Sequence, residues 1–277
     1  MIALGLASCG TPERPGGTIP GFEGVPATKA PIDEDGVLHP NEVDGVGWGS
    51  EFVEEPLRVL QVLPVTLSGI SITAVTFDSR TLRLVIADQE GGPGSRWADA
   101  EAAAKELGGV AAVNAGFFTP EGKPLGLVVT GGKRAGSVNR ASSLGAGMYI
   151  GGNSPALRRR EHGGGGSEVL QSGPFLVENG RAISGLSTDS STARTVIGWD
   201  GGSGWFIART GGCSLAALGK ALAGAKISGV KAHTVLNLDG GRSSDLWVAA
   251  AVPGGPVSQR PIWNKPVRNF LVLVPRR

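Results

Sequence analysis

Apolar and polar residues alternate over short stretches along most of the chain, a period of two that is typical of half-buried strands. Nearly every stretch is bounded by Gly, Pro, Asp or Asn, which favours tight turns between them. The pattern predicts strands at 57–63, 70–77, 82–87, 110–113, 126–129, 148–150, 167–171, 175–177, 195–199, 205–209, 235–238 and 270–274. The segments 195–199 and 205–209 are expected to form a hairpin.

Two segments follow the helical period instead. The first extends from Ser95, a suitable N-cap, to Leu107, where two glycines stop it. The second extends from Ser214 to Gly224 and places leucines three or four residues apart on one face. Two modest helices among about ten strands predict a single α+β domain with mixed or antiparallel sheets. The chain has no internal repeat.

The N-terminal part differs in composition. Residues 10–50 are rich in Gly, Pro, Glu and Asp without apolar periodicity, which indicates a disordered linker before a domain at 51–277. The preceding residues 1–9 end in Leu-Ala-Ser-Cys and resemble the end of a lipoprotein signal, with Cys9 as the lipidated residue. This apolar stretch is short and has no basic start, so either the recorded start codon is too far downstream or the match is accidental. We favour the lipoprotein interpretation, which predicts a lipid-anchored protein of the cell envelope.

Composition excludes several function classes. Lys+Arg 26 against Asp+Glu 24 gives a net charge of +2, with no basic face interleaved with aromatics, so nucleic-acid binding is not expected. No Cys or His spacing resembles a metal site, and Cys213 is interpreted as a small buried residue. The arginines at 158–160 are interpreted as an exposed loop, a phosphate contact being the less favoured alternative. No stretch is long enough to span a membrane.

Four polar clusters stand at the ends of apolar stretches, where sheets present functional groups. They are Asn-Ala-Gly-Phe-Phe at 114–118, Gln-Ser-Gly-Pro at 171–174, Arg-Thr at 194–195 and Asn-Leu-Asp-Gly-Gly-Arg-Ser-Ser at 237–244. Taken singly, the first three are explained as well by turns or a surface ion pair as by function. Ser172 lacks the Gly-x-Ser-x-Gly elbow, which argues against a serine hydrolase that uses Ser172 or Ser243.

The cluster at 237–244 carries the strongest chemical signal. Asp239 is a carboxylate at the end of an apolar strand, followed by Gly240 and Gly241, which let a ligand approach the main chain and let N–H groups cradle an anion. A hairpin turn is the alternative, since Asp-Gly is a favoured turn pair. The neighbouring Asn237 and the serines at 243–244 favour function. No Gly-Lys-Ser/Thr element is present, so this is not a nucleotide P-loop.

The order of these motifs resembles the phosphodiester glycosidase domain family. The sequence has Asn-Ala-Gly-Phe-Phe, Gln-Ser-Gly-Pro, Arg-Thr-x-Ile-Gly, Leu-Asn-Leu-Asp-Gly-Gly and a late Pro-Val-x-Asn, over about 70–274. It departs from the family pattern at two places. Arg242 stands where the family usually has a third Gly, and Asn264-Lys265 stands where it usually has Glu-Arg before the late motif. Both changes add or shift positive charge near the proposed site.

The resemblance implies cleavage between an anomeric carbon and a phosphodiester oxygen, with a glycan or sugar-phosphodiester as substrate. It implies Asp239 as catalytic carboxylate, Arg194 gripping the phosphate with help from the two glycine N–H groups, and Asn114 and Asn237 as orienting groups. The substrate-binding residues are then Gly116, Phe117, Ser172, Gly173, Thr195, Gly240, Gly241, Ser243, Ser244 and Asn269. No cofactor is implied, although a divalent cation on Asp239 is chemically reasonable. A non-catalytic carbohydrate-binding module of the same fold is the alternative.

Overall fold

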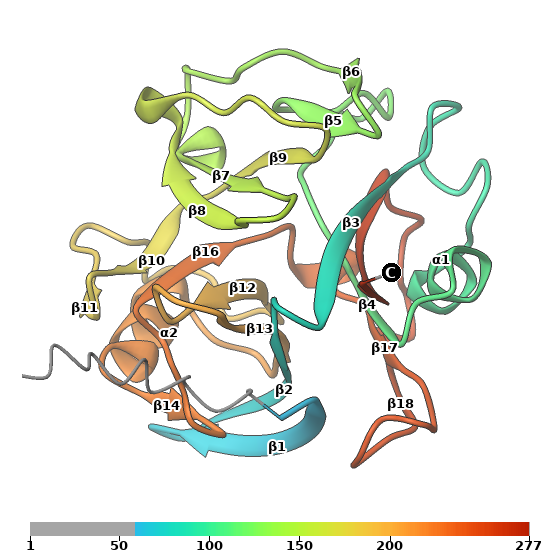
Figure 1. The fold of residues 1–277 in the computed structure, drawn as a ribbon. Coiled ribbons are helices and arrows are strands. Elements are labelled where there is room, and N and C mark those ends of the chain that lie inside the picture. The colour runs from blue at the N-terminus through green and yellow to red at the C-terminus, as the bar shows by residue number, and fades with distance from the viewer. Residues whose placement is uncertain (1–58, 277) are drawn as a thin grey trace, which may run out of the picture. The chain divides into compact units, whose positions relative to one another are not determined.

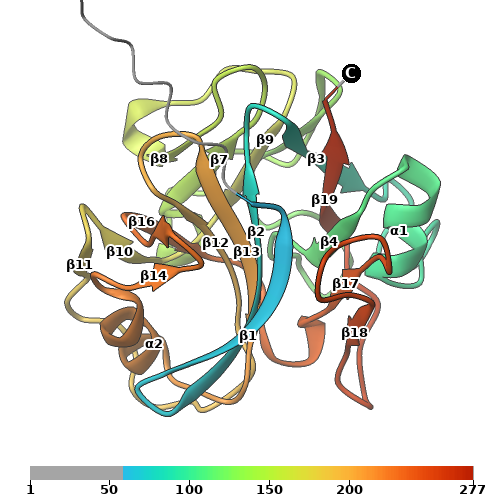
Figure 2. The ribbon, with the colours of Figure 1, turned by 60° about the horizontal axis from the view of Figure 1, so that its bottom comes forward.

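The computed structural model describes residues 59–276. Within this range the chain forms one seven-stranded sheet, two five-stranded sheets and a small two-stranded sheet, all with antiparallel pairing (Figures 1 and 2). The expected α+β class with two helices is confirmed. The predicted lipidation residue Cys9 and the predicted linker at 10–50 lie outside the described residues.

The seven-stranded sheet carries the N-terminal hairpin at one edge. Its order is β1 (Gln61–Leu67), β2 (Ile70–Asp78), β13 (Gly204–Thr210), β12 (Thr195–Trp199), β16 (Thr234–Asn237), β10 (Phe175–Glu178) and β11 (Arg181–Ala182). The predicted hairpin of β12 and β13 is confirmed, with Thr195 opposite Arg209. Helix α2 (Leu215–Leu222) covers the outer face, and its N-cap Ser214 accepts the Ala217 N–H at 3.1 Å, as expected. The two-stranded sheet of β14 (Lys226–Ile227) and β15 (Val230–Lys231) contributes Ile227 and Val230 to the apolar cluster between the seven-stranded sheet and α2.

A five-stranded sheet contains the C-terminal strand. Its order is β18 (Val257–Gln259), β17 (Leu246–Val248), β4 (Ala111–Asn114), β19 (Asn269–Pro275) and β3 (Leu82–Asp88). Helix α1 (Ala100–Leu107) packs on its outer face (Figure 1). The predicted N-cap Ser95 is wrong: the cap is Asp99, whose side chain accepts the Ala102 N–H at 2.8 Å. The buried Gln89 side chain binds the backbone of residues 96 and 97, which holds that segment outside the helix.

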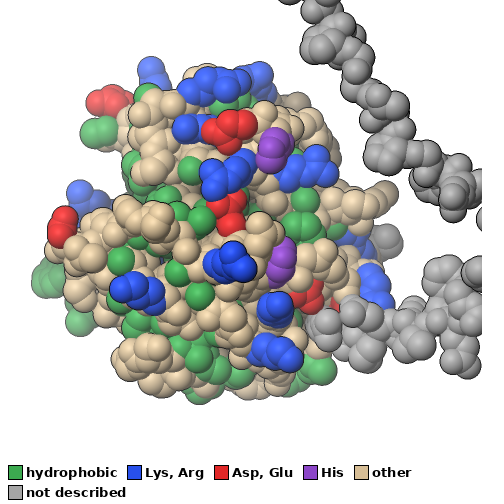
Figure 3. All heavy atoms as spheres, turned by 90° about the vertical axis from the view of Figure 1, so that its left-hand side faces the viewer, with side chains coloured by type: hydrophobic (Ala, Val, Ile, Leu, Met, Phe, Trp, Pro, Cys, Tyr) green, Lys and Arg blue, Asp and Glu red, His purple; other side chains and the backbone are tan. Residues whose placement is uncertain are grey.

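The third sheet closes one end of the space between the other two (Figure 1). Its order is β6 (Lys133–Ala135), β5 (Val128–Thr130), β9 (Val169–Ser172), β7 (Gly147–Ile150) and β8 (Ala156–Arg159). The prediction that the arginines at 158–160 form a loop is wrong for two of them, which end β8. Arg159 pairs with Glu178 and Arg160 with Glu161. Basic and acidic side chains accordingly lie side by side on the face seen in Figure 3.

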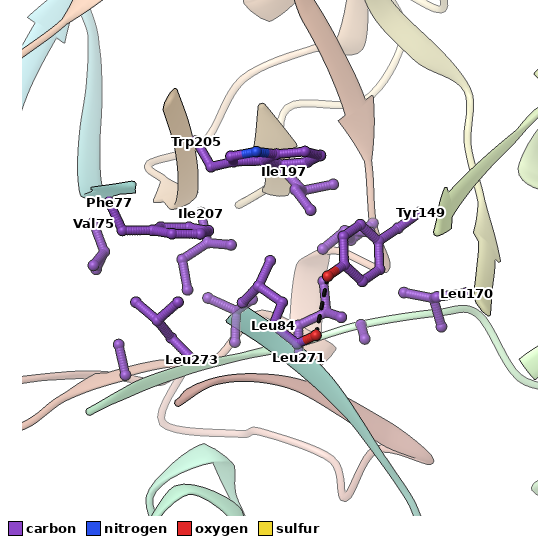
Figure 4. Close-up of a cluster of buried hydrophobic side chains, with 14 of the residues drawn as sticks. Val75, Phe77, Leu84, Tyr149, Leu170, Ile197, Trp205, Ile207, Leu271 and Leu273 are labelled. Carbon is purple, nitrogen blue, oxygen red and sulfur yellow. Dashed lines mark hydrogen bonds between the residues drawn. The ribbon is translucent and has the colours of Figure 1, made fainter. Parts of the chain in front are cut away.

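The main core lies where the three sheets face one another (Figure 4). Trp205 from β13 meets Tyr149 from β7 edge to face, with ring centroids 5.9 Å apart. The Tyr149 hydroxyl donates to the Leu84 carbonyl of β3 at 3.0 Å, and burial raises the pKa of that hydroxyl. One aromatic pair thus ties the three sheets together and satisfies the buried hydroxyl.

Gly198 in β12 gives a test of the packing of the seven-stranded sheet. It lies opposite Phe206 of β13, and a Cβ added at Gly198 would fall 2.0 Å from the Phe206 ring. We expect Gly198→Ala to lower the free energy of unfolding by about 1–3 kcal/mol, because the ring has to move in a close-packed core. Urea unfolding measures this. The matched change Gly202→Ala in the exposed turn should be nearly neutral, and equal effects of the two would contradict the assigned register.

Candidate active site

Three sheets contribute strand ends to one place in the structure. The backbone N–H of Asp239, just after β16, donates to the Ala115 carbonyl just after β4 at 2.8 Å. The N–H of Asn237 donates to the Pro174 carbonyl, between β9 and β10, at 3.0 Å. The N–H of Gly241 donates to the Ala193 carbonyl before β12 at 2.7 Å. The four polar clusters that the sequence singled out are therefore brought together, although the first and the last are more than a hundred residues apart in the chain.

The buried side chain of Asn114 connects three of the segments that meet at this place. Its side-chain Nδ2 donates to the Asp239 carbonyl at 2.7 Å. Its Oδ1 accepts the Thr195 hydroxyl at 2.7 Å and the Asp245 N–H at 3.0 Å. Both Asn114 and Thr195 are completely buried. They fix the loop that carries Asp239 and do not reach solvent in this structure.

Asn237 and Ser172 form a second buried pair. The Asn237 Nδ2 donates to the Gly173 carbonyl at 3.0 Å, and the Ser172 hydroxyl donates to the Asn237 carbonyl at 2.9 Å. The Asn237 Oδ1 and the Ser244 hydroxyl are both buried without a hydrogen-bond partner in the described residues. Ser172 is fully buried and its proton is engaged, so this geometry does not support Ser172 as a nucleophile.

Asn269, the first residue of β19, fixes the loop that follows β4. Its Oδ1 accepts the Gly116 N–H at 2.7 Å, and a Cβ added at Gly116 would fall 3.1 Å from a methyl group of Leu170. The preceding Arg268 forms a bidentate pair with Asp88, with N–O distances of 2.9 and 2.7 Å. This pair neutralises the charge of Arg268. Lys265, one of the two residues before the late motif that depart from the family pattern, is exposed.

Solvent reaches a different set of the predicted residues. Asp239 is half-buried, and its Oδ1 accepts the Gly240 N–H at 2.8 Å. Burial raises the pKa of Asp239 to about 6, against the opposing effect of hydrogen bonds from Ser243 and Gly240. Phe117, Gly241 and Ser243 are also partly exposed. Asp239 thus combines access to solvent with a pKa raised by burial, a combination typical of catalytic acids and bases.

Arg194 lies beside this loop. A Cβ added at Gly240 would fall 3.6 Å from the Arg194 Cδ. The guanidinium donates to the Cys213 carbonyl at 3.1 Å and to the Ser190 carbonyl and hydroxyl at 2.8 and 2.9 Å. These acceptors are neutral, and among residues 59–276 Arg194 takes part in no ion pair with a carboxylate. The Nε and Nη2 groups are thus engaged within the chain, and within the described residues Nη1 is the part of the guanidinium left to meet an anion.

In this structure the two glycine N–H groups that the sequence analysis assigned to a phosphate have partners within the chain. The Gly240 N–H is bound to the carboxylate of Asp239, and the Gly241 N–H is bound to the Ala193 carbonyl. A phosphate contact through either N–H group stays a prediction that requires exchange of these partners. The glycines are needed for a different reason, since a Cβ at Gly240 would fall 3.0 Å from the Ala193 carbonyl oxygen and Gly241 has a φ of 61°.

Sequence reasoning missed Asp245. This residue is 2% exposed, and its Oδ2 accepts the Ala100 N–H at 2.9 Å and lies 3.5 Å from the Nε of Arg260. Burial raises the pKa of Asp245 to about 6. The available signal was a lone aspartate directly before the apolar Leu-Trp-Val stretch of β17. From this buried position Asp245 supports α1 through the Ala100 N–H and binds Asn114 through its own backbone N–H.

Within the described residues, neither a group of potential metal ligands nor the hollow beside β3 lies at this site. Within residues 59–276, no three His, Cys, Asp or Glu side chains gather as a metal site would require, so a cation at Asp239 would depend on that carboxylate and neutral oxygens. A hollow of about 1160 Å³ lies between β3 and the β5–β6 hairpin, with Asp88, Gln89 and Lys133 among its lining residues, but Asp239 does not line it. Neither helix of the described range is long and apolar enough to cross a bilayer.

The fold and the assembled motifs define a family. The family model for phosphodiester glycosidase matches residues 107–274, more than half of the chain, and the protein belongs to this family. The resemblance inferred from the motifs is confirmed. No curated protein matches the chain in sequence.

Solved structures share the fold. The catalytic domain of zebrafish N-acetylglucosamine-1-phosphodiester alpha-N-acetylglucosaminidase, auto-inhibited by its pro-peptide, superimposes with a TM-score of 0.55 at 16% identity, over 78% of this chain and 82% of that one. A hypothetical protein from Synechocystis superimposes with a TM-score of 0.53 at 18% identity, over 78% of this chain and 62% of that one. At these identities the likeness establishes the fold alone.

Proposed function

We propose that the protein is a hydrolase that cleaves the glycosidic bond of a sugar-1-phosphodiester. The observation that carries the proposal is the pairing of a solvent-reachable carboxylate, Asp239, with an arginine beside it that has no carboxylate partner. A phosphodiester offers both complements, because its anion suits Arg194 and the positive charge that develops on the sugar ring in the transition state suits Asp239.

The chemistry needs a single carboxylate. Water attacks the anomeric carbon, the bond from that carbon to the phosphate oxygen breaks, and its electron pair stays on the oxygen. The products are a free sugar and a phosphomonoester. The leaving group is already a stable anion, so it needs little help from a general acid, unlike the alkoxide of an ordinary glycoside. Asp239 accepts the proton of the attacking water or stabilises the oxocarbenium-like ring. Asn114 and Asn237 position the loop from its buried side.

The proposed place of action is the cell envelope, where lipidation at Cys9 would anchor the domain near surface glycans. The location and the lipid anchor are inferred from the sequence alone. A non-catalytic carbohydrate-binding module of the same fold is the competing proposal. The solvent-reachable position of Asp239, together with its raised pKa, favours the enzyme, because this combination is typical of catalytic acids and bases.

Hydrolysis of a panel of sugar-1-phosphodiesters tests the proposal, starting with methyl α-N-acetylglucosamine-1-phosphate and varying sugar and anomer. Release of free sugar and of phosphomonoester in equal amounts is the expected result. Binding of sugars without turnover of any diester would instead establish the binding module. Labelling of the protein by a fluorophosphonate probe would support a serine hydrolase.

The pH dependence follows from the raised pKa of Asp239. Both roles of Asp239 require the ionised carboxylate, so kcat/KM should rise with pH and level off above about 6, the value to which burial raises that pKa. Asp245 has a similar raised pKa but is buried, so Asp245→Asn should leave the acidic limb in place. A pH–rate profile of both proteins measures this. An acidic limb with an apparent pKa near 4, or loss of this limb in Asp245→Asn, would contradict its assignment to Asp239.

Arg194→Gln tests the phosphate contact. Charge-assisted hydrogen bonds contribute about 1.5–3 kcal/mol, so we expect kcat/KM to fall about 10- to 100-fold, with binding of the phosphomonoester product weakened to a similar degree. Binding of the free sugar should be unchanged. Because the guanidinium also binds Cys213 and Ser190, circular dichroism must show an intact fold. The exposed Arg181→Gln in β11 is the matched control, and equal losses in both variants would contradict a specific role for Arg194.

A further inference from the structure

Two of the most exposed large apolar side chains of the described range are neighbours in sequence. Ile262 is 94% exposed and Trp263 is 77% exposed. Together with Pro261 and Arg242 they line a hollow of about 590 Å³. Exposed large apolar side chains that gather at one place indicate a binding surface more often than isolated ones do.

Arg242 joins this hollow to the candidate active site. It lies in the short 3-10 helix η3 (Gly241–Ser243), directly after the glycines that follow Asp239. Its Nε donates to the Trp263 carbonyl at 3.0 Å, and its own carbonyl accepts the Lys265 N–H at 3.3 Å. Two hydrogen bonds of Arg242 therefore connect the loop that carries Asp239 to the turn at 261–265.

Positive charge and apolar groups lie together on this surface. Arg242 and Lys265 are both exposed, and neither takes part in an ion pair within residues 59–276. Arg242, which follows Asp239 and the two glycines in the chain, lines the hollow together with Pro261, Ile262 and Trp263. The matching ligand is an anion that continues into an apolar group.

We propose that this hollow is the subsite for the aglycone of the phosphodiester, and that the preferred aglycone is apolar, an alkyl or aryl group. The inference rests on the proposed function and extends it from the bond that is cleaved to the substrate class. The sugar occupies the side of Asp239, the phosphate lies between Arg194 and Arg242, and the aglycone packs on Trp263. Arg242, which departs from the family pattern, is then a specificity-determining residue.

The test compares two diesters of the same sugar-1-phosphate, one with a methyl and one with a hexyl aglycone. The wild-type protein is expected to hydrolyse the hexyl diester with a kcat/KM about tenfold or more above that of the methyl diester, from burial of the chain. Trp263→Ala should remove most of this preference by lowering kcat/KM for the hexyl diester alone. Val59→Ser, a change at an exposed apolar residue in another part of the chain, should keep the preference.

Direct binding separates failure of this inference from failure of the proposed function. Hexyl phosphate should bind the wild-type protein more tightly than methyl phosphate, and Trp263→Ala should abolish the difference, even if no diester is turned over. An unchanged aglycone preference in Trp263→Ala, or equal binding of the two phosphates, overturns the inference. Binding to phosphatidylcholine vesicles that Trp263→Ala removes without altering diester selectivity would assign the surface to a membrane instead, and would also overturn it.

Discussion

Asp239→Asn is expected to lower kcat by about 1000-fold or more while leaving the fold intact. A positioned carboxylate that acts as general base contributes about 10²–10⁴-fold, and electrostatic stabilisation of a charged transition state adds to this. Asparagine is nearly isosteric and keeps an oxygen that can accept the Gly240 N–H, which Asp239 Oδ1 accepts at 2.8 Å in the structure. The variant therefore removes the negative charge with little change in shape.

The same substitution should stabilise the protein at neutral pH. Burial raises the pKa of Asp239 from 3.8 to about 6, so ionisation of this group disfavours the folded state by up to about 3 kcal/mol. The folded chain binds more protons than the unfolded chain between these values, and its stability falls as pH rises from about 4 to about 6. Asparagine escapes this cost. The stability difference between variant and wild type should be small at pH 4 and largest at pH 7.

Turnover and thermal unfolding at several pH values measure both effects, with Asp245→Asn as the control. Asp245 has a similarly raised pKa but is 2% exposed, so its amide variant should keep turnover within about tenfold. Full activity in Asp239→Asn would remove Asp239 from the chemistry. A loss of activity accompanied by unfolding would leave the stability argument wrong and assign the residue to the fold.

Asn114→Ala is expected to lower the free energy of unfolding by about 3–5 kcal/mol. The substitution removes hydrogen bonds to the Asp239 carbonyl, the Thr195 hydroxyl and the Asp245 N–H, with distances of 2.7, 2.7 and 3.0 Å. Each of the three partner groups loses this hydrogen bond, and because Asn114 is completely buried, water cannot easily replace it. Unsatisfied buried groups cost more than the hydrogen bonds that they lose.

Calorimetry should show a fall in the unfolding temperature of about 10 °C for a domain of this size. Below that temperature the variant should lose activity as well, because the carbonyl of Asp239 is no longer held. Asn153→Ala, at an exposed position, is the matched control and should change neither quantity. If Asn114→Ala keeps wild-type stability but loses affinity for sugar, then Asn114 contacts substrate and does not serve as a support.

Much of the fold follows from local sequence. The strand expected at 195–199 coincides with β12, and the expected hairpin to β13 forms across residues 200–203. Helix α2 begins after Ser214, where the pattern placed its cap. These elements are determined by period, caps and turn residues, which act within a few positions of one another. Strands without alternation, such as β17 and β18, were missed because they are three residues long and form through pairing with distant partners.

The sequence by itself determined the family, the α+β class and the set of motifs that meet at the candidate site. Only the tertiary structure decided what each residue in that set faces. It turned Asn114, Thr195 and Ser172 inward as supports and left Asp239 and Arg194 within reach of solvent. It also engaged the N–H groups of Gly240 and Gly241 within the chain. The physical reason is that a motif fixes residue types over a few positions, whereas burial, hydrogen-bond partners and pKa depend on segments that are distant in sequence.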